Sequence, residues 1–292
     1  MCGIIGYIGA NCFMCLLNGL KQLQNRGYDS AGICLLDSEN KFNCEKYAST
    51  HSQTAISKLE NTIQNLDSDT TINVGIGHTR WATHGPKTDI NSHPHIDTLE
   101  KKFVLVHNGI IENFQVLKNN IIRESGGSIK FKSQTDTEVI VNLLAWEYSQ
   151  RNNNNCVLTA IRNTINKLEG TFALCILCTD TPNKMYCVRK GSPLLLSWNS
   201  DIFYVASEQS GFCNLVNRYI CLDNDDICIA EYSEGNGNKK ITVRTDKNYS
   251  PKSISSNKYD SLTPDPYTYW TMKEIMEQTH SLDRAISYGG RI

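Results

Sequence analysis

Short apolar segments separated by turn residues fill much of this chain and limit the folds that it can adopt. Eight of them have the length and composition of strands: Ile4–Ile8, Ala31–Leu36, Val74–Ile76, Phe103–Val106, Phe172–Thr179, Met185–Arg189, Leu194–Trp198 and Ile202–Ala206. Three longer segments have apolar residues at helical spacing: Phe13–Leu23, Asp136–Tyr148 and Val157–Lys167. This order of elements predicts an α+β fold.

Charge and composition narrow the kinds of partner. Of the 292 residues 40% are hydrophobic, enough for one large or two ordinary domains, and the formal net charge is -1. Because the basic residues are scattered, the chain offers no general attraction to nucleic acid or to an anionic membrane. No apolar run reaches the roughly 18 residues of a membrane span, and the N-terminus lacks a signal-type segment. We therefore expect a cytoplasmic protein whose partners are small molecules or proteins.

Twelve cysteines raise the question of disulfides and of metal sites. In a chain of this length without a signal segment, reduced thiols are expected. The pairs Cys12/Cys15 and Cys175/Cys178 have the spacing of zinc ligands. However, residues three apart on the predicted strand around Cys175 point to opposite faces and cannot share one metal ion. We interpret these cysteines as small buried apolar side chains.

The second residue is a cysteine, and this position has a chemical meaning. Removal of Met1 would leave Cys2 with a thiol and a free α-amine on one residue. The unperturbed pKa of an α-amine, roughly 7.7–8.0, lets it accept a proton near neutral pH. Cys2 is therefore a candidate nucleophile that carries its own base.

A loop bounded by Gly77 and Gly85 has the composition of a binding loop. Its Arg80 offers a planar fork for a carboxylate or phosphate, and Thr83 and His84 can donate further hydrogen bonds to the same anion. An ordinary polar turn is the alternative interpretation.

Four histidines, His78, His84, His93 and His95, fall within eighteen residues and suggest a metal site. No carboxylate or cysteine stands at a supporting ligand spacing, and hydrogen-bonded loop histidines explain the cluster equally well. We expect neither a metal ion nor a cofactor.

The pair Asn108-Gly109 follows the apolar strand that ends near Val106. A tight turn is the common use of Asn-Gly. The functional alternative is an oxyanion hole, in which the Asn108 amide and the Gly109 backbone N–H converge on a developing negative oxygen. Further along, Ser133–Glu138 predicts a helix start, whose acidic residues serve either as caps or as ligands for a substrate ammonium.

These segments together resemble the class II glutamine amidotransferases. The motifs that carry the resemblance span residues 2 to about 210: Cys2–Gly6, Asn25–Gly32, Arg80–Gly85, Asn108–Asn113, Thr135–Glu138, Glu169–Ala173, Arg189–Leu194 and Ala206–Gln209. The resemblance implies an N-terminal nucleophile hydrolase fold, a four-layer αββα sandwich of two antiparallel sheets. Asn25 replaces an aromatic residue that is usual in the family.

Within the superfamily, the Arg80–Gly85, His93–His95 and Asn108–Asn113 motifs are similar to the glutamine:fructose-6-phosphate aminotransferase branch, also called glucosamine-6-phosphate synthase. The phosphoribosyl amidotransferase branch is the alternative. Met272–Gln278 resembles the start of the sugar isomerase domain in the first branch, although Thr279 stands where proline is usual.

The resemblance implies roles for individual residues. Cys2 attacks the side-chain amide of L-glutamine through a thioester, and Asn108 and Gly109 hold the oxyanion. Further residues bind the substrate, order the site or gate the ammonia route. The α-carboxylate is implied to be bound by Arg80, Thr83 and His84, and the α-ammonium by Asp136. Arg26 is implied to order the nucleophile, and Trp81 is implied to gate the route of the ammonia.

The predicted organisation is a glutaminase domain over residues 1–246, a linker over 247–268, and a helical segment over 269–292 that opens a sugar isomerase domain missing from the chain. The implied function is the ammonia-donating half of an enzyme of hexosamine biosynthesis, with oligomerisation of the full enzyme, and the chain alone is not expected to make glucosamine 6-phosphate. Two other possibilities are a stand-alone glutaminase that feeds another synthase and a non-catalytic module that senses glutamine.

Overall fold

The computed structural model describes residues 2–24, 27–63, 74–82, 85–150, 156–235, 238–254, 266–279 and 282. The chain divides into two compact units, Met1–Ile254 and Ser255–Ile292. The second unit contains α6 (Trp270–Met276), which is shorter than the helical segment predicted over 269–292. Most of the remainder of that prediction lies outside the described residues, and the division into domain, linker and further domain stays a prediction.

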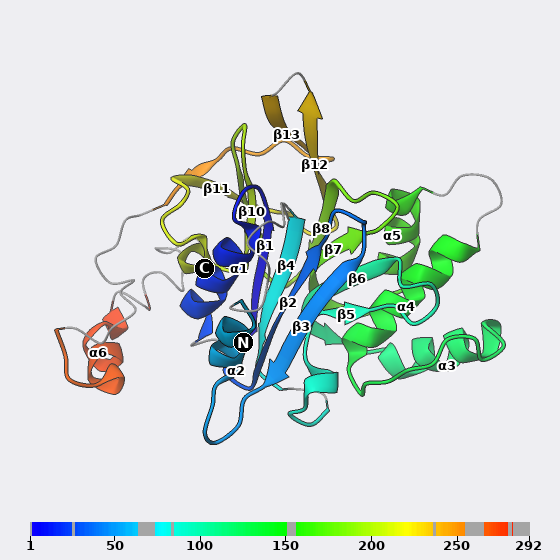
Figure 1. Ribbon diagram of the computed structural model, residues 1–292, viewed down its shortest axis with the longest axis horizontal. Helices are drawn as coiled ribbons and strands as arrows, with labels where there is room; N and C mark the ends of the chain where they lie inside the picture. The colour runs from blue at the N-terminus through cyan, green and yellow to red at the C-terminus, as the bar shows by residue number, and fades with distance from the viewer. Residues whose placement is uncertain are drawn as a thin grey trace. The chain divides into compact units, whose positions relative to one another are not determined.

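The first unit is built on two antiparallel sheets (Figure 1). The larger has the order β14-β11-β9-β10-β1-β4-β2-β3. Its strands have these bounds: β1 Gly3–Ile8, β2 Ser30–Leu36, β3 Phe42–Ala48, β4 Val74–Arg80, β9 Leu195–Trp198, β10 Phe203–Ala206, β11 Arg218–Cys221 and β14 Lys252–Ser253. In its centre β1 pairs with both β4 and β10.

The smaller sheet has the order β13-β12-β8-β7-β6-β5. Its strands have these bounds: β5 His95–Ile96, β6 Phe103–Ile111, β7 Gly170–Cys178, β8 Lys184–Lys190, β12 Ile227–Gly235 and β13 Asn238–Arg244. The helices of this unit are α1 Cys12–Gln22, α2 Ala55–Ile63, α3 Phe114–Glu124, α4 Asp136–Ser149 and α5 Val157–Ile165, with short 3-10 turns η2 Asp89–Asn91 and η3 Gln209–Phe212.

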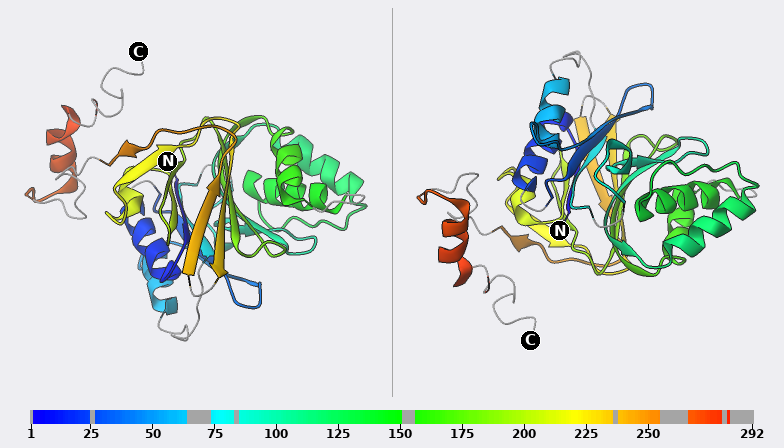
Figure 2. Two further views of the ribbon diagram at one scale, coloured as in Figure 1. Left: turned by 90° about the horizontal axis from the view of Figure 1, so that it is seen from above. Right: turned by 90° about the horizontal axis from the view of Figure 1, so that it is seen from below.

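Three apolar clusters hold the layers together. Alternate residues of β1 separate into two of them: Ile4 and Ile8 pack between the sheets, whereas Ile5 and Tyr7 pack under α1 and α2. The third cluster lies between the smaller sheet and the helices α3, α4 and α5. Figure 2 shows the helices on the two outer sides and the sheets between them. The predicted four-layer αββα sandwich is therefore confirmed.

Cys175 and Cys178 occupy different layers of this sandwich. Cys175 packs between the two sheets, and Cys178 belongs to the cluster under α3, α4 and α5. Both are buried on β7. This is the alternation that the strand pattern predicts for residues three apart.

The prediction that the apolar strand ends before Asn108-Gly109 was wrong, as was the tight turn considered there. Strand β6 continues through both residues to Ile111, and Gly109 pairs with Phe172 of β7. Gly109 has φ +133, and a Cβ at this position would lie 2.0 Å from the Thr171 carbonyl oxygen. Glycine is required there because a side chain would collide with the neighbouring strand.

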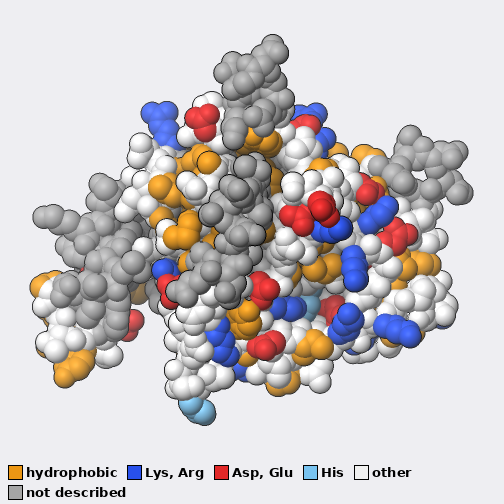
Figure 3. Space-filling model, in the orientation of Figure 1, with side chains coloured by type: hydrophobic (Ala, Val, Ile, Leu, Met, Phe, Trp, Pro, Cys, Tyr) orange, Lys and Arg blue, Asp and Glu red, His pale blue; other side chains and the backbone are white. Residues whose placement is uncertain are grey.

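Surface properties agree with the absence of a strong charge bias. On the face shown in Figure 3, lysine and arginine groups are interspersed with aspartate and glutamate groups. Every helix within the described ranges is too short or too polar to span a bilayer.

Candidate active site

The strand register places Cys2 at one end of the larger sheet. Gly3, the first residue of β1, pairs with Thr79 of β4, so Cys2 lies beside the residues that follow β4. The Trp81 N–H donates a hydrogen bond to the Cys2 sulfur at 3.3 Å, and the thiol lies 3.6 Å from the Trp81 carbonyl oxygen. Cys2 is partly exposed. The backbone of Trp81 therefore holds the candidate nucleophile at the surface of the domain.

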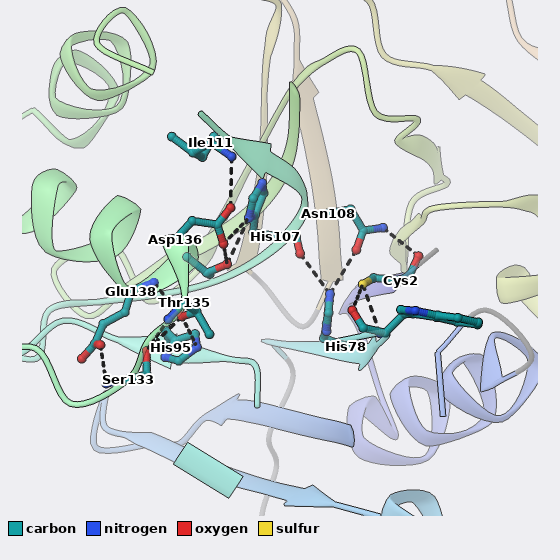
Figure 4. A network of polar contacts seen from close by, with 12 residues as sticks. Cys2, His78, His95, His107, Asn108, Ile111, Ser133, Thr135, Asp136 and Glu138 are labelled. Carbon is teal, nitrogen blue, oxygen red and sulfur yellow. Dashed lines mark hydrogen bonds and ion pairs between the residues drawn. The ribbon is translucent and has the colours of Figure 1, made fainter. Parts of the chain in front are cut away.

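Asn108 reaches Cys2 from the facing sheet. Its Nδ2 donates to the Cys2 carbonyl oxygen at 3.0 Å, and its Oδ1 lies 3.0 Å from Nε2 of His78 (Figure 4). The Asn108 side chain is thus held from both ends, because each amide atom has a hydrogen-bond partner. Gly109, the next residue on β6, lines the adjoining pocket.

Arg80 is the last residue of β4 and is only 3% exposed. Burial lowers the pKa of its guanidinium, and negative charge on Cys2, Asp136 and Asp29 opposes this effect. An arginine nevertheless stays protonated in proteins. The domain therefore carries a buried cation close to the candidate nucleophile.

Asp136 begins helix α4 and supplies the opposite charge. Its Oδ2 accepts a hydrogen bond from the Ile111 N–H at 3.0 Å, and its Oδ1 lies 3.8 Å from Nδ1 of His107. Thr135 caps the helix by accepting from the Glu138 N–H at 3.2 Å. The Asp136 side chain therefore lies at the positive end of the helix and is held by the backbone of β6.

Glu138 has a different task from Asp136, although it lies only two residues later. Its two oxygens accept hydrogen bonds from the backbone N–H groups of Lys132 and Ser133 at 2.7 and 2.6 Å. It thus closes the loop before α4 as a variant of the capping box. Of the two acids that the sequence suggested as caps or ligands, Glu138 acts as the cap and Asp136 faces the pocket.

These side chains meet at one pocket. The lining combines a thiol, a cation and a carboxylate with neutral side chains. The lining residues are Cys2, Arg80, Trp81, His93, His107, Gly109, Thr135, Asp136 and Thr137.

Three further predicted site residues, Arg26, Thr83 and His84, lie outside the described residues. Their flanks are described. Asp29 accepts from the Ala82 N–H at 2.9 Å and forms an ion pair with Lys87 at 3.3 Å, so it binds both sides of the segment that contains Thr83 and His84. The sequence analysis gave Asp29 no role, although it stands inside the Asn25–Gly32 motif.

A buried layer of histidines lies beneath the site. The rings of His78 and His93 stack at 4.2 Å, and His93 meets His95 edge-on at 5.1 Å. Burial lowers the pKa of all three, that of His78 to about 3, so they are neutral at pH 7. His95 and His107 bond the hydroxyls of Thr135 and Thr137, each at 3.0 Å. Hydrogen bonding, the alternative to a metal site, describes His78 and His95, whereas His93 contacts both of them through its ring.

The described residues contain no group of three His, Cys, Asp or Glu side chains that could hold a metal ion.

Two residues that the sequence analysis missed support the histidine layer. Lys46 donates to the carbonyl oxygens of Ser92 and Pro94 at 2.7 and 3.0 Å, and a Cβ on Gly32 would lie 2.2 Å from the His93 carbonyl oxygen. Lys46 has no local sequence signal, and Gly32 was part of the Asn25–Gly32 motif without an assigned role, because each acts across the fold.

Comparison with known proteins gives matches over most of the chain. Residues 78–214 match the family described as "Glutamine amidotransferase domain". A glutamine–fructose-6-phosphate aminotransferase of Thermococcus kodakarensis is 39% identical, and the match covers all of this chain and 46% of that enzyme. The corresponding enzyme of Bacteroides thetaiotaomicron is 36% identical, and the match covers 95% of this chain and 43% of that enzyme. The chain therefore spans less than half the length of these relatives.

Among solved structures, the chain is similar to a glutamine phosphoribosylpyrophosphate amidotransferase from B. subtilis, with a TM-score of 0.61 and 25% identity. A second structure, described as the allosteric regulatory enzyme of purine biosynthesis, gives a TM-score of 0.63 and 26% identity. Each match covers 82% of this chain and 48% of the other.

Proposed function

The chain belongs to the class II glutamine amidotransferases, and from this premise we propose that it hydrolyses L-glutamine to L-glutamate and ammonia with the thiol of Cys2 as the nucleophile. One observation carries the proposal: Cys2, Arg80 and Asp136 line the same pocket although up to 134 residues separate them in sequence. A nucleophile between a cation and a carboxylate matches a substrate that has an amide at one end and an α-amino acid group at the other.

Charge determines how glutamine is oriented. Arg80 binds the α-carboxylate through its guanidinium fork, with help from Thr83 and His84, and Asp136 pairs with the α-ammonium. The two charged groups lie at separate positions of the pocket wall, one at the end of β4 and the other at the start of α4. The side-chain amide then extends toward Cys2.

The proposed reaction begins once Met1 has been removed and the α-amine of Cys2 is free. The sulfur attacks the side-chain amide carbon of glutamine, and the carbonyl oxygen becomes an oxyanion held by Asn108 Nδ2 and the Gly109 N–H. The thiol proton passes through the α-amine to the leaving nitrogen, the C–N bond breaks, and ammonia departs. Water then attacks the thioester, breaks the C–S bond, and releases glutamate with the thiol restored.

We assign residues at the rim of the pocket to the release of ammonia and to the ordering of the nucleophile. Trp81 is 45% exposed and its ring meets that of Tyr28 edge-on at 5.5 Å. We assign Trp81 to gating the path by which ammonia leaves and Arg26 to ordering the nucleophile, both from the family resemblance. No cofactor or metal enters this scheme.

For the whole protein we propose the ammonia-donating half of a glutamine:fructose-6-phosphate aminotransferase, in the cytoplasm. The 35–39% identity to such enzymes supports this branch over the phosphoribosyl branch, whose solved structures are 25–26% identical. The partner is a sugar isomerase domain with a fructose 6-phosphate site, in an oligomeric enzyme without nucleic acid or membrane. The proposed division remains 1–246, 247–268 and 269–292.

The proposal is tested by intact mass and a glutamine turnover assay before and after treatment with diazo-oxo-norleucine, an electrophilic glutamine analogue. We expect loss of Met1, release of glutamate, and one adduct on Cys2 that stops turnover. A retained Met1, or neither glutamate nor adduct, would overturn the catalytic proposal and favour the glutamine-sensing module.

A further inference from the structure

His78 is a fully buried residue of β4 that the proposed mechanism does not use. Its Nε2 lies 3.0 Å from the backbone carbonyl oxygen of His107 and 3.0 Å from Oδ1 of Asn108 (Figure 4). It therefore contacts the residue that is proposed to stabilise the oxyanion, from the side opposite Cys2.

The direction of these hydrogen bonds follows from the partners. A backbone carbonyl can only accept, so Nε2 of His78 carries the proton and donates. The atom of Asn108 that faces His78 must then be the accepting Oδ1, which turns Nδ2 toward Cys2. The Cys2 backbone oxygen is also an acceptor, and Nδ2 donates to it at 3.0 Å. Two carbonyl groups at opposite ends therefore fix one amide orientation.

The surroundings of His78 keep its ring neutral and in place. The ring stacks on His93 at 4.2 Å, and burial disfavours its charged form, as do the nearby charge of Arg80 and the ring of His107. A neutral imidazole has one N–H and one bare nitrogen, so Nε2–H is the only donor that it offers.

We propose that His78 is a positioning residue that locks the Asn108 amide with its NH₂ group toward the reacting carbonyl. The inference rests on the proposed glutaminase function. Without the N–H of His78, the amide can rotate by 180° and present Oδ1 to the developing oxyanion, where two negative oxygens repel each other. His78 never touches the substrate, and its effect passes through Asn108.

Two substitutions at His78 distinguish the effect of its N–H donor from the effect of its ring. His78→Phe keeps a planar ring without the N–H, and His78→Gln carries an amide donor near the position of Nε2. We expect His78→Phe to lower kcat by about 10- to 100-fold, less than the roughly 10²–10³-fold cost of removing an oxyanion donor outright, with KM within about twofold. His78→Gln should recover most of the loss. Equal kcat values for the two variants, or an effect confined to KM, would overturn the inference.

Tyr148→Phe serves as the matched control for loss of one hydrogen bond, since the Tyr148 hydroxyl donates to Asp180 at 2.7 Å and lies outside the pocket lining. It should leave kcat unchanged. A double-mutant cycle then tests the route: in an Asn108→Ala background, His78→Phe should change kcat by less than about twofold. A full additional loss in that background would show that His78 does not act through Asn108.

The tautomer of His78 gives a test that needs no variant. Nitrogen-15 NMR of the wild-type imidazole should show a neutral ring protonated at Nε2 at pH 7, and a ring protonated at Nδ1 would overturn the inference even if the variants fail to fold. Should the wild-type protein release no glutamate, the proposed function fails, and this measurement still decides whether His78 locks Asn108.

Discussion

The floor and the rim of the pocket differ in how firmly their side chains are held. The floor, defined as Asp136 of the pocket lining together with His78 and Asn108 behind the lining, is at most 8% exposed, and each member is fixed by hydrogen bonds to backbone or side-chain groups. At the rim, Tyr28 and Trp81 are 55% and 45% exposed, and their rings pack mainly on each other. Groups that stabilise a transition state need fixed positions, whereas groups through which a ligand enters or leaves can adapt.

Cys2, the proposed nucleophile, lies beside both regions, and its removal should have the largest effect. Cys2→Ala is expected to lower glutamate release by more than about 10³-fold, because no thioester can form. Since Cys2 is partly exposed and its sulfur meets the backbone of Trp81, the melting temperature should change little. Residual turnover near that of the wild-type protein would identify another nucleophile.

Removing the amide of the floor should have the next largest effect. Asn108→Ala deletes one proposed oxyanion donor, and we expect kcat to fall by roughly 10²–10³-fold with a small change in KM. Asn108→Asp is the matched variant, since it keeps the shape of the side chain and replaces the donor by an acceptor. The kcat of Asn108→Asp should fall at least as far as that of Asn108→Ala. Full activity of Asn108→Asp would place the oxyanion elsewhere.

Two carboxylates at the start of α4 allow a sharper comparison within the floor. Asp136→Asn removes the charge that is proposed to pair with the substrate ammonium, and KM should rise by about 10- to 100-fold with little loss of stability. Glu138→Gln should instead cost about 1–3 kcal/mol of stability, because one of two buried backbone N–H groups faces an amide NH₂. Its KM should stay near the wild-type value. Steady-state kinetics and denaturant unfolding of both variants check the contrast.

The buried histidines, His78 of the floor with His93 and His95 beside it, predict a loss of stability in acid. His78 has a folded-state pKa of about 3, against about 6.5 for an unfolded histidine, so the unfolded chain binds more protons between these values. Stability is therefore complete above pH 6.5 and falls as the pH drops toward 3, and His93 and His95 act in the same direction. The melting temperature should be lower at pH 5 than at pH 7.5, and by a smaller margin in His78→Gln.

Sequence alone predicted the strands and helices whose apolar residues dominate, and it predicted the charged and nucleophilic residues of the pocket. It missed the helices α2 and α3 and the strands β3, β5, β11, β12, β13 and β14. At the edge of its sheet, β3 buries only Ala48, and α3 buries only Leu117 and Ile121 among its eleven residues. The support for the floor was missed for another reason: Lys46 and Gly32 act through contacts between strands and loops that only the assembled fold brings together.

The smallest effect is expected at the rim. Tyr28→Leu removes a ring that packs on Trp81 but makes no contact with the floor, and exposed substitutions of this kind usually change stability by less than about 0.5 kcal/mol. Glutamate release should remain within about twofold of the wild-type rate. If the rim instead orders the site, kcat would fall as far as it does in a floor variant, and the division between a fixed floor and an adaptable rim would be lost. Measuring Tyr28→Leu beside His78→Phe, under one set of conditions, therefore tests whether preorganisation in this domain is confined to its buried side.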